Sequence, residues 1–189
     1  MTGIGSCCAK WLLVVARASK YLSTTAPFDL ARGIIPQLVG CSQSPISSLV
    51  VRGLDAGDVQ SQDLLSSFLI AFGDRLTSVD VSICFLLHSH LQQLGYCKNL
   101  RSLTMGRCTS LSEASLQYLW TQPNIFLVLR QVDVSHTTAK AETIRVLLST
   151  HSALTDVLSP HLPGMDLYDL DIDYPQVNFY TVNDDNASP

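Results

Sequence analysis

The sequence predicts an α/β solenoid, in which short parallel strands line a concave face and helices cover the convex face. Two observations predict this fold: an apolar triplet that recurs every 24 to 30 residues, and apolar residues at helical spacing after each triplet. A triplet is an apolar residue, two variable positions, a second apolar residue, one variable position and a third apolar residue. The four regular triplets are Ile46-Leu49-Val51, Leu76-Val79-Val81, Leu100-Leu103-Met105 and Leu129-Val132-Val134.

Each triplet predicts a short strand whose three apolar side chains point into the core. A fifth and poorer triplet, Leu154-Val157-Ser159, predicts one more strand. Three positions beyond each regular triplet comes a ninth position, where we expect the side chain to turn inward and satisfy backbone groups. The four ninth-position residues are Leu54, Cys84, Cys108 and Thr137.

A helix is expected after each regular triplet. The second apolar stripe, for example, consists of Leu86, Leu87, Leu91 and Leu94. The third helix is expected to begin with a capping box formed by Ser110 and Glu113, because a hydroxyl residue followed three positions later by glutamate satisfies free N–H groups.

The two ends of the chain depart from the repeat, which spans residues 46–162. Residues 1–43 predict an N-terminal helical cap, with apolar residues at helical spacing from Trp11 through Tyr21 and Leu22. Residues 163–189 predict an acidic C-terminal cap and a frayed tail. Within this cap Leu167, Leu170 and Ile172 fit the triplet once more and predict an edge strand.

Composition excludes several classes of function. The 189 residues are 47% apolar and 15% charged, which is typical of a packed domain and not of a disordered chain. The net charge is −4 and no basic block is present, which argues against binding of nucleic acid or of an anionic membrane. The six cysteines form no C-x-x-C pair, which indicates reduced thiols. We identify no targeting segment, so the expected location is the cytoplasm or the nucleus.

Catalytic chemistry is not predicted. Cys84, His88 and His90 are close in sequence, but tetrahedral zinc needs four convergent ligands, and the two histidines lie at opposed angles on a helix. No serine, histidine and acid combination carries a nucleophile motif. We therefore predict no enzyme activity, no catalytic residue, no metal and no cofactor. An enzyme with an unrecognised site is the alternative from another class.

The repeats resemble leucine-rich repeats of the ribonuclease-inhibitor-like and cysteine-containing types. The phrases Leu76-Thr-Ser-Val-Asp-Val-Ser and Leu129-Arg-Gln-Val-Asp-Val-Ser are similar to those of ubiquitin-ligase substrate receptors. Ile4, Cys8 and Leu12 resemble the box with which receptors of the zyg-11 and zer-1 type dock on elongin B/C and a cullin. The resemblance implies a substrate-recognition subunit of a cullin-RING ligase. The alternatives are a plain capping helix, and a scaffold or assembly factor unrelated to ubiquitination.

The outward positions of the predicted strands form the candidate partner-binding surface. They are small, polar and mildly acidic, which favours a flat bed for an extended peptide or a basic loop of a protein partner. The alternative is a solvated face without a dedicated ligand. The predicted partner-binding residues are Ser78, Asp80, Ser82, Ser102, Thr104, Gln131, Asp133 and Ser135.

Overall fold

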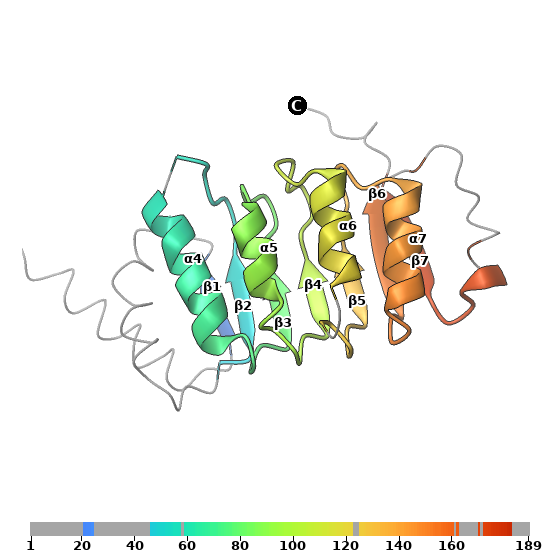
Figure 1. Cartoon of the computed structure of the whole chain (residues 1–189), viewed down its shortest axis with the longest axis horizontal. Coiled ribbons are helices and arrows are strands. Elements are labelled where there is room, and N and C mark those ends of the chain that lie inside the picture. Colours follow the sequence, from blue (N-terminus) through green and yellow to red (C-terminus); the bar gives the residue numbers. More distant parts are fainter. Residues whose placement is uncertain are drawn as a thin grey trace, which may run out of the picture.

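The computed structural model describes residues 21–24, 46–57, 59–122, 125–160, 162, 170 and 172–182. These residues form a parallel sheet with helices on one face (Figure 1). The strands are β1 (Tyr21–Thr24), β2 (Ser48–Val51), β3 (Ser78–Asp80), β4 (Ser102–Thr104), β5 (Gln131–Asp133), β6 (Asp156–Pro160) and β7 (Asn178–Val182). The helices are α4 (Val59–Phe72), α5 (His88–Leu94), α6 (Glu113–Thr121) and α7 (Ala141–Thr150). The predicted α/β class is confirmed.

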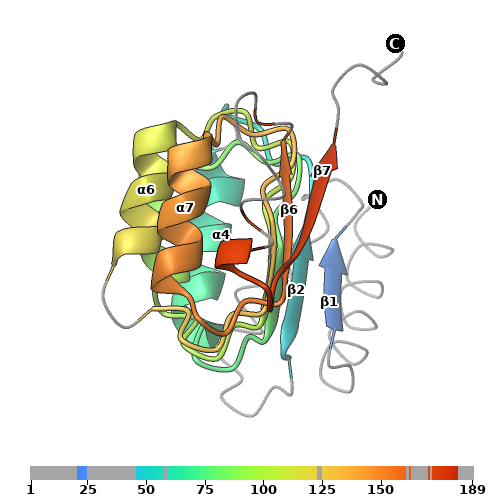
Figure 2. The ribbon, with the colours of Figure 1, turned by 90° about the vertical axis from the view of Figure 1, so that its right-hand side faces the viewer.

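The order of the strands in the sheet is their order in the chain, and each strand pairs in parallel with the next. The central apolar residue of each triplet stands beside the same residue of its neighbour, so that Leu49, Val79, Leu103, Val132 and Val157 form one continuous row. Figure 2 shows the helices in one layer, with β1 and β7 farther from that layer than β2 and β6. The sheet therefore curves away from the helices.

The core lies between the sheet and the helices, where the triplet residues pack against helical side chains. Every residue of the four regular triplets is at most 3% exposed, and the helices contribute large buried side chains such as Phe68, Phe72 and Trp120. The fifth triplet is also buried, including Ser159. The triplets thus form strands with inward apolar residues, as the spacing predicts.

The ninth positions confirm their predicted inward role at both cysteines. The thiol of Cys84 donates to the carbonyl of Val51 at 3.3 Å, and that of Cys108 donates to Val81 at 3.0 Å. Each thiol therefore ties one repeat to the strand before it. Both cysteines are buried and free, and burial raises the pKa of Cys84 to about 11 and that of Cys108 to about 12. The thiols stay protonated and act as structural donors.

The residue before each ninth position adopts a left-handed backbone. The φ angles are 72° at Gly53, 59° at Ile83, 61° at Arg107 and 54° at His136. A branched residue such as Ile83 rarely adopts this conformation, which favours glycine. The repeated turn therefore overrides the local preference of the residue that occupies it.

The ends of the sheet differ from the prediction. Tyr21 and Leu22 belong to β1 and not to a helix, and the remainder of the predicted cap lies outside the described residues. The edge strand predicted through Leu170 and Ile172 is wrong, because the N–H of Tyr174 donates to the carbonyl of Leu170 in a helical turn. The strand at this edge is β7, within the segment predicted as a cap and frayed tail.

Two helix starts also differ from the prediction. The N-cap of α6 is Ser112, whose side chain accepts the N–H of Ser115 at 3.2 Å. Ser110 lies before the N-cap and accepts the N–H of Leu86 at 2.9 Å, which ties the segment that leads into α6 to the preceding repeat. At α5, the apolar stripe predicted through Leu87 is wrong at this residue, because Leu87 is 42% exposed while His90 is buried.

Among the described residues, no helix combines the length and apolar content needed to cross a membrane.

Candidate protein-binding face

The sheet face turned away from the helices carries two rows of side chains that run across the strands. We call this surface the sheet face. The first row is Ser48, Ser78, Ser102, Gln131, Asp156 and Asn178. The second row is Val50, Asp80, Thr104, Asp133, Leu158 and Tyr180. The parallel register creates these rows, since every strand presents the same repeat position beside its neighbour.

The structure places all eight predicted partner-binding residues on or beside these rows. Six of them lie directly in the rows. Ser82 and Ser135 follow the ends of β3 and β5, and their N–H groups donate to Oδ1 of Asp80 and Asp133 at 3.0 and 2.8 Å. These two serines thus hold the aspartates in place.

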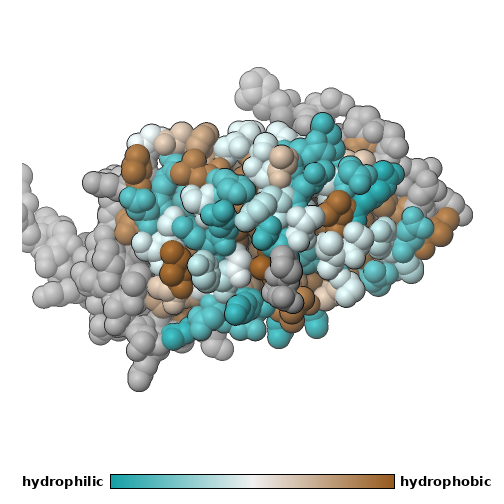
Figure 3. Space-filling view, viewed as in Figure 1, coloured by the Kyte–Doolittle hydropathy of each residue, from teal (hydrophilic) through white to brown (hydrophobic). Residues whose placement is uncertain are grey.

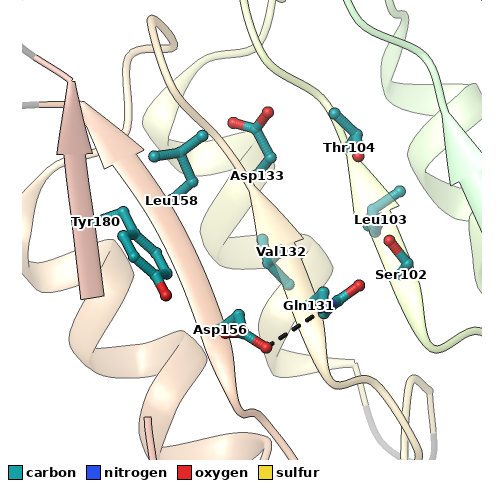
Figure 4. Close-up of a pocket in the computed structure, with 9 residues that line it drawn as sticks. All are labelled: Ser102, Leu103, Thr104, Gln131, Val132, Asp133, Asp156, Leu158 and Tyr180. Carbon is teal, nitrogen blue, oxygen red and sulfur yellow. Dashed lines mark hydrogen bonds between the residues drawn. The ribbon is translucent and has the colours of Figure 1, made fainter. Parts of the chain in front are cut away.

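A shallow hollow of about 180 Å³ lies in the sheet face over β4 to β7 (Figure 4). Its lining residues are Ser102, Leu103, Thr104, Gln131, Val132, Asp133, Asp156, Leu158 and Tyr180. Tyr180 was missed by the sequence analysis because β7 was not predicted. The alternation of Val177 and Phe179, which turn inward, with Asn178 and Tyr180, which are exposed, is the signal that could have found this strand.

The negative charge of Asp80 is balanced by Arg52 within the sheet face. Its Oδ2 accepts from Nε of Arg52 at 3.0 Å, and Arg52 comes from the neighbouring strand end. Burial acts to raise the pKa of Asp80, but the hydrogen bonds from Ser82 and Arg52 outweigh it and lower this pKa. Asp80 therefore stays ionised and already has a cation beside it.

Asp133 and Asp156 have different surroundings. Within the described part of the chain, no cation lies within ion-pair distance of either carboxylate. Asp156 accepts hydrogen bonds from Thr155 at 2.8 Å and from Asn178 at 3.1 Å, and these bonds lower its pKa. The hollow is therefore anionic at neutral pH, whereas the Arg52–Asp80 end of the sheet face is balanced.

The three residues considered for metal binding have separate roles. The Cys84 thiol bonds to a backbone carbonyl, and the ring of the exposed His88 packs against that of Tyr118, with centroids 4.6 Å apart and the planes tilted by 52°. His90 accepts the N–H of Leu87 at Nδ1, and its Nε2 lies 3.1 Å from the carbonyl of Gln62. In the described ranges, no group of three or more His, Cys, Asp or Glu residues is arranged to hold a metal ion.

The helix face differs from the sheet face in the distribution of its described residues. Figure 3 shows hydrophobic residues scattered among hydrophilic ones over the helices.

The elongin-box residues Ile4, Cys8 and Leu12 lie outside the described residues. Scanned against models of known protein families, the chain matches none, and a search of curated proteins finds no match either.

Proposed function

We propose that this chain is a non-catalytic leucine-rich-repeat protein whose sheet face binds a protein partner. The observation that carries the proposal is the pair of polar rows across the strands, with a hollow at one end. A repeating parallel sheet presents its outward side chains as one extended surface, which suits an extended peptide or loop. The regular triplets and the chain-order sheet support the leucine-rich-repeat assignment.

Within this class we propose a substrate-recognition subunit of a cullin–elongin ubiquitin ligase. The support is the resemblance of the Val-Asp-Val-Ser phrases to those receptors and the spacing of Ile4, Cys8 and Leu12. In that role the N-terminal segment docks on elongin B/C and the sheet face takes the substrate. A scaffold or assembly factor uses the same face without elongin.

The binding face is tested with arginines introduced on opposite sides of the molecule. Ser102→Arg with Thr104→Arg places two large side chains on β4 in the sheet face. Ser89→Arg with Gln92→Arg places the same two side chains on exposed positions of α5 and serves as the control. We expect the first pair to remove partners from an affinity purification and the second to retain them. Partners that survive the sheet-face pair would contradict the proposal.

The ligase role is tested by a pull-down of elongin B/C. Cys8→Asp with Leu12→Asp places two charges in the apolar docking segment and should abolish recovery of elongin. Circular dichroism must show that the variant is folded. Failure of the wild-type chain to recover elongin, alongside a partner that depends on the sheet face, would favour the scaffold.

A further inference from the structure

Strands β3 and β5 end in the same phrase, Val-Asp-Val-Ser. Asp80 and Asp133 occupy the same position in the second row, two strands apart. Each carboxylate accepts the N–H of the serine two residues later, at 3.0 and 2.8 Å. The two aspartates therefore share this backbone bond, and the hydroxyl of Ser82 donates to Oδ1 of Asp80 as well.

The second oxygen distinguishes the two sites. In β3 it accepts from the guanidinium of Arg52, which shows how an arginine docks on this phrase. Continuing the register of β2 with β3 by two residues places Arg52 beside Ser82, and the same extension between β4 and β5 places Gly106 beside Ser135. The position that carries the arginine in the first pair of strands thus carries no side chain in the second.

Among the described residues, no cation takes the place at Gly106 that Arg52 has beside Asp80. A Cβ added at Gly106 would lie 3.2 Å from Oδ2 of Asp133, so the carboxylate lies directly over the glycine backbone. Among the described residues, no cation forms an ion pair with Asp133. Arg130 lies three residues along the strand, roughly 10 Å away, and Arg107, whose N–H donates to the carbonyl of Ser135 at 2.8 Å, is not paired with it either.

The other side of the hollow is apolar. Leu158 stands beside Asp133 in the row and Tyr180 beside Leu158, with Tyr180 54% exposed (Figure 4). Neighbouring strands are about 4.8 Å apart, so an extended side chain bonded to Asp133 reaches across Leu158 toward the Tyr180 ring. The charge of Asp156 strengthens the attraction for a cation.

We propose that this hollow binds an arginine side chain presented by an extended segment of the partner protein. The guanidinium bonds to Asp133, the methylene stem packs on Leu158, and Tyr180 contacts the stem or the adjoining residue. Arginine fits better than lysine because its planar fork matches a carboxylate and packs on aromatic rings. This inference rests on the proposed function, since it names the chemistry of the partner that the sheet face takes.

The first test titrates the ¹⁵N-labelled full chain with acetyl-Gly-Arg-Gly-amide and follows amide shifts by NMR. We expect saturable shifts at Asp133, Leu158 and Tyr180, and at least a tenfold loss of affinity in Asp133→Asn. Asp63→Asn is the control, because it removes an exposed carboxylate of α4 on the helix face, away from the hollow, and affinity should stay within twofold. A peptide with citrulline, which has the same shape without the charge, should cause no saturable shift. Absence of saturable shifts with arginine, or equal affinity in Asp133→Asn, overturns the inference.

The second test separates this inference from the proposed function. A displayed library of random twelve-residue peptides is selected on the wild-type chain and counter-selected on Ser102→Arg with Thr104→Arg. Enrichment of arginine, lost on Asp133→Asn, supports the inference. Peptides that depend on the sheet face but show no enrichment of arginine overturn the inference and leave the proposed function standing. A selection that yields no peptide dependent on the sheet face overturns both.

Discussion

The phrase Val-Asp-Val-Ser begins in β3 and again in β5, and in both an aspartate accepts the N–H of the serine two residues later, yet the two carboxylates meet different neighbours. Asp80 has Arg52 beside it, and Asp133 has Gly106. The difference lies 27 to 28 residues earlier in the chain, about one repeat, where the adjacent strand ends. In a sheet that follows chain order, the chemistry of a surface position is therefore set by the preceding repeat as much as by its own sequence.

The comparison requires that β3 and β5 pack on one shared core. The largest effect is therefore expected from a cavity in that core, between the two strands. Leu103 of β4 is 0% exposed and stands between Val79 and Val132. Leu103→Ala should lower the free energy of unfolding by about 2–5 kcal/mol, because it leaves a cavity. The measurement is a urea melt.

Thr104→Ala is the control for this change, since Thr104 lies on the other face of the same strand. It should shift the free energy of unfolding by about 0.5 kcal/mol or less. Equal effects of the two substitutions would mean that β4 does not have the inward face described here.

The interior repeats could be predicted from the sequence because each strand has neighbours on both sides. Leu100, Leu103 and Met105 are buried as their spacing predicts. The edges could not be predicted in the same way. β1 pairs with one described neighbour, β2, and β7 pairs with β6, so the apolar pattern of an edge strand is incomplete. The left-handed backbone at Ile83 could not be predicted from the local sequence, because the neighbouring repeats impose this conformation on a residue that does not favour it.

The candidate site was predictable in its positions but not in its electrostatics. Outward residues such as Ser102 and Thr104 follow directly from the period of two in a strand. The pairing of Arg52 with Asp80 depends on register and side-chain reach, and the contribution of Tyr180 depends on finding β7. Charge balance on the sheet face therefore required the structure.

The helices that follow β3 and β5, which are α5 and α7, each have a buried histidine at one end, and the two histidines can be compared in the same way. His90 lies at the start of α5 and His151 at the end of α7, and burial lowers the pKa of both. The unfolded chain then binds more protons than the folded chain below about pH 6.5. The stabilisation is fully present above this pH and is lost as the pH falls, so the free energy of unfolding should decrease from pH 7.5 to 5.5.

Conservative substitutions measure how much of this pH dependence each of the two histidines contributes. Nδ1 of His90 accepts the N–H of Leu87, and a proton on Nδ1 breaks that bond, which is worth about 1 kcal/mol. His90→Gln keeps an acceptor without the titration and should flatten part of the decrease, as should His151→Gln. Stability that is constant over this range, or a slope unchanged in both variants, would contradict the assignment of neutral histidines.

The turns after β2 and β3 sharpen the comparison at a smaller scale. Gly53 and Ile83 adopt the same left-handed backbone, but glycine is the residue that adopts it without strain. Gly53→Ala should lower the free energy of unfolding by about 1 kcal/mol, although no atom lies within 4 Å of the added Cβ. Ile83→Gly should leave stability unchanged or increase it slightly, since relief of strain offsets the entropy of glycine. Melting curves test both, and a loss at Ile83→Gly as large as that at Gly53→Ala would refute the equivalence of the turns.

The smallest expected effect is the difference in the free energy of unfolding between Asp80→Asn and Asp133→Asn. Asp80→Asn removes the charge partner of Arg52 and should cost about 0.2–1 kcal/mol, since Arg52 is half exposed and such ion pairs are weak. Asp133→Asn removes a carboxylate with no cation in the described surroundings and keeps an oxygen that can accept the N–H of Ser135. Its free energy of unfolding should match that of the wild type within about 0.3 kcal/mol. The difference should shrink in high salt, which screens the Arg52–Asp80 pair. If Asp133→Asn proves the more destabilising of the two, Asp133 serves the fold, and the contrast between a satisfied and an available carboxylate fails.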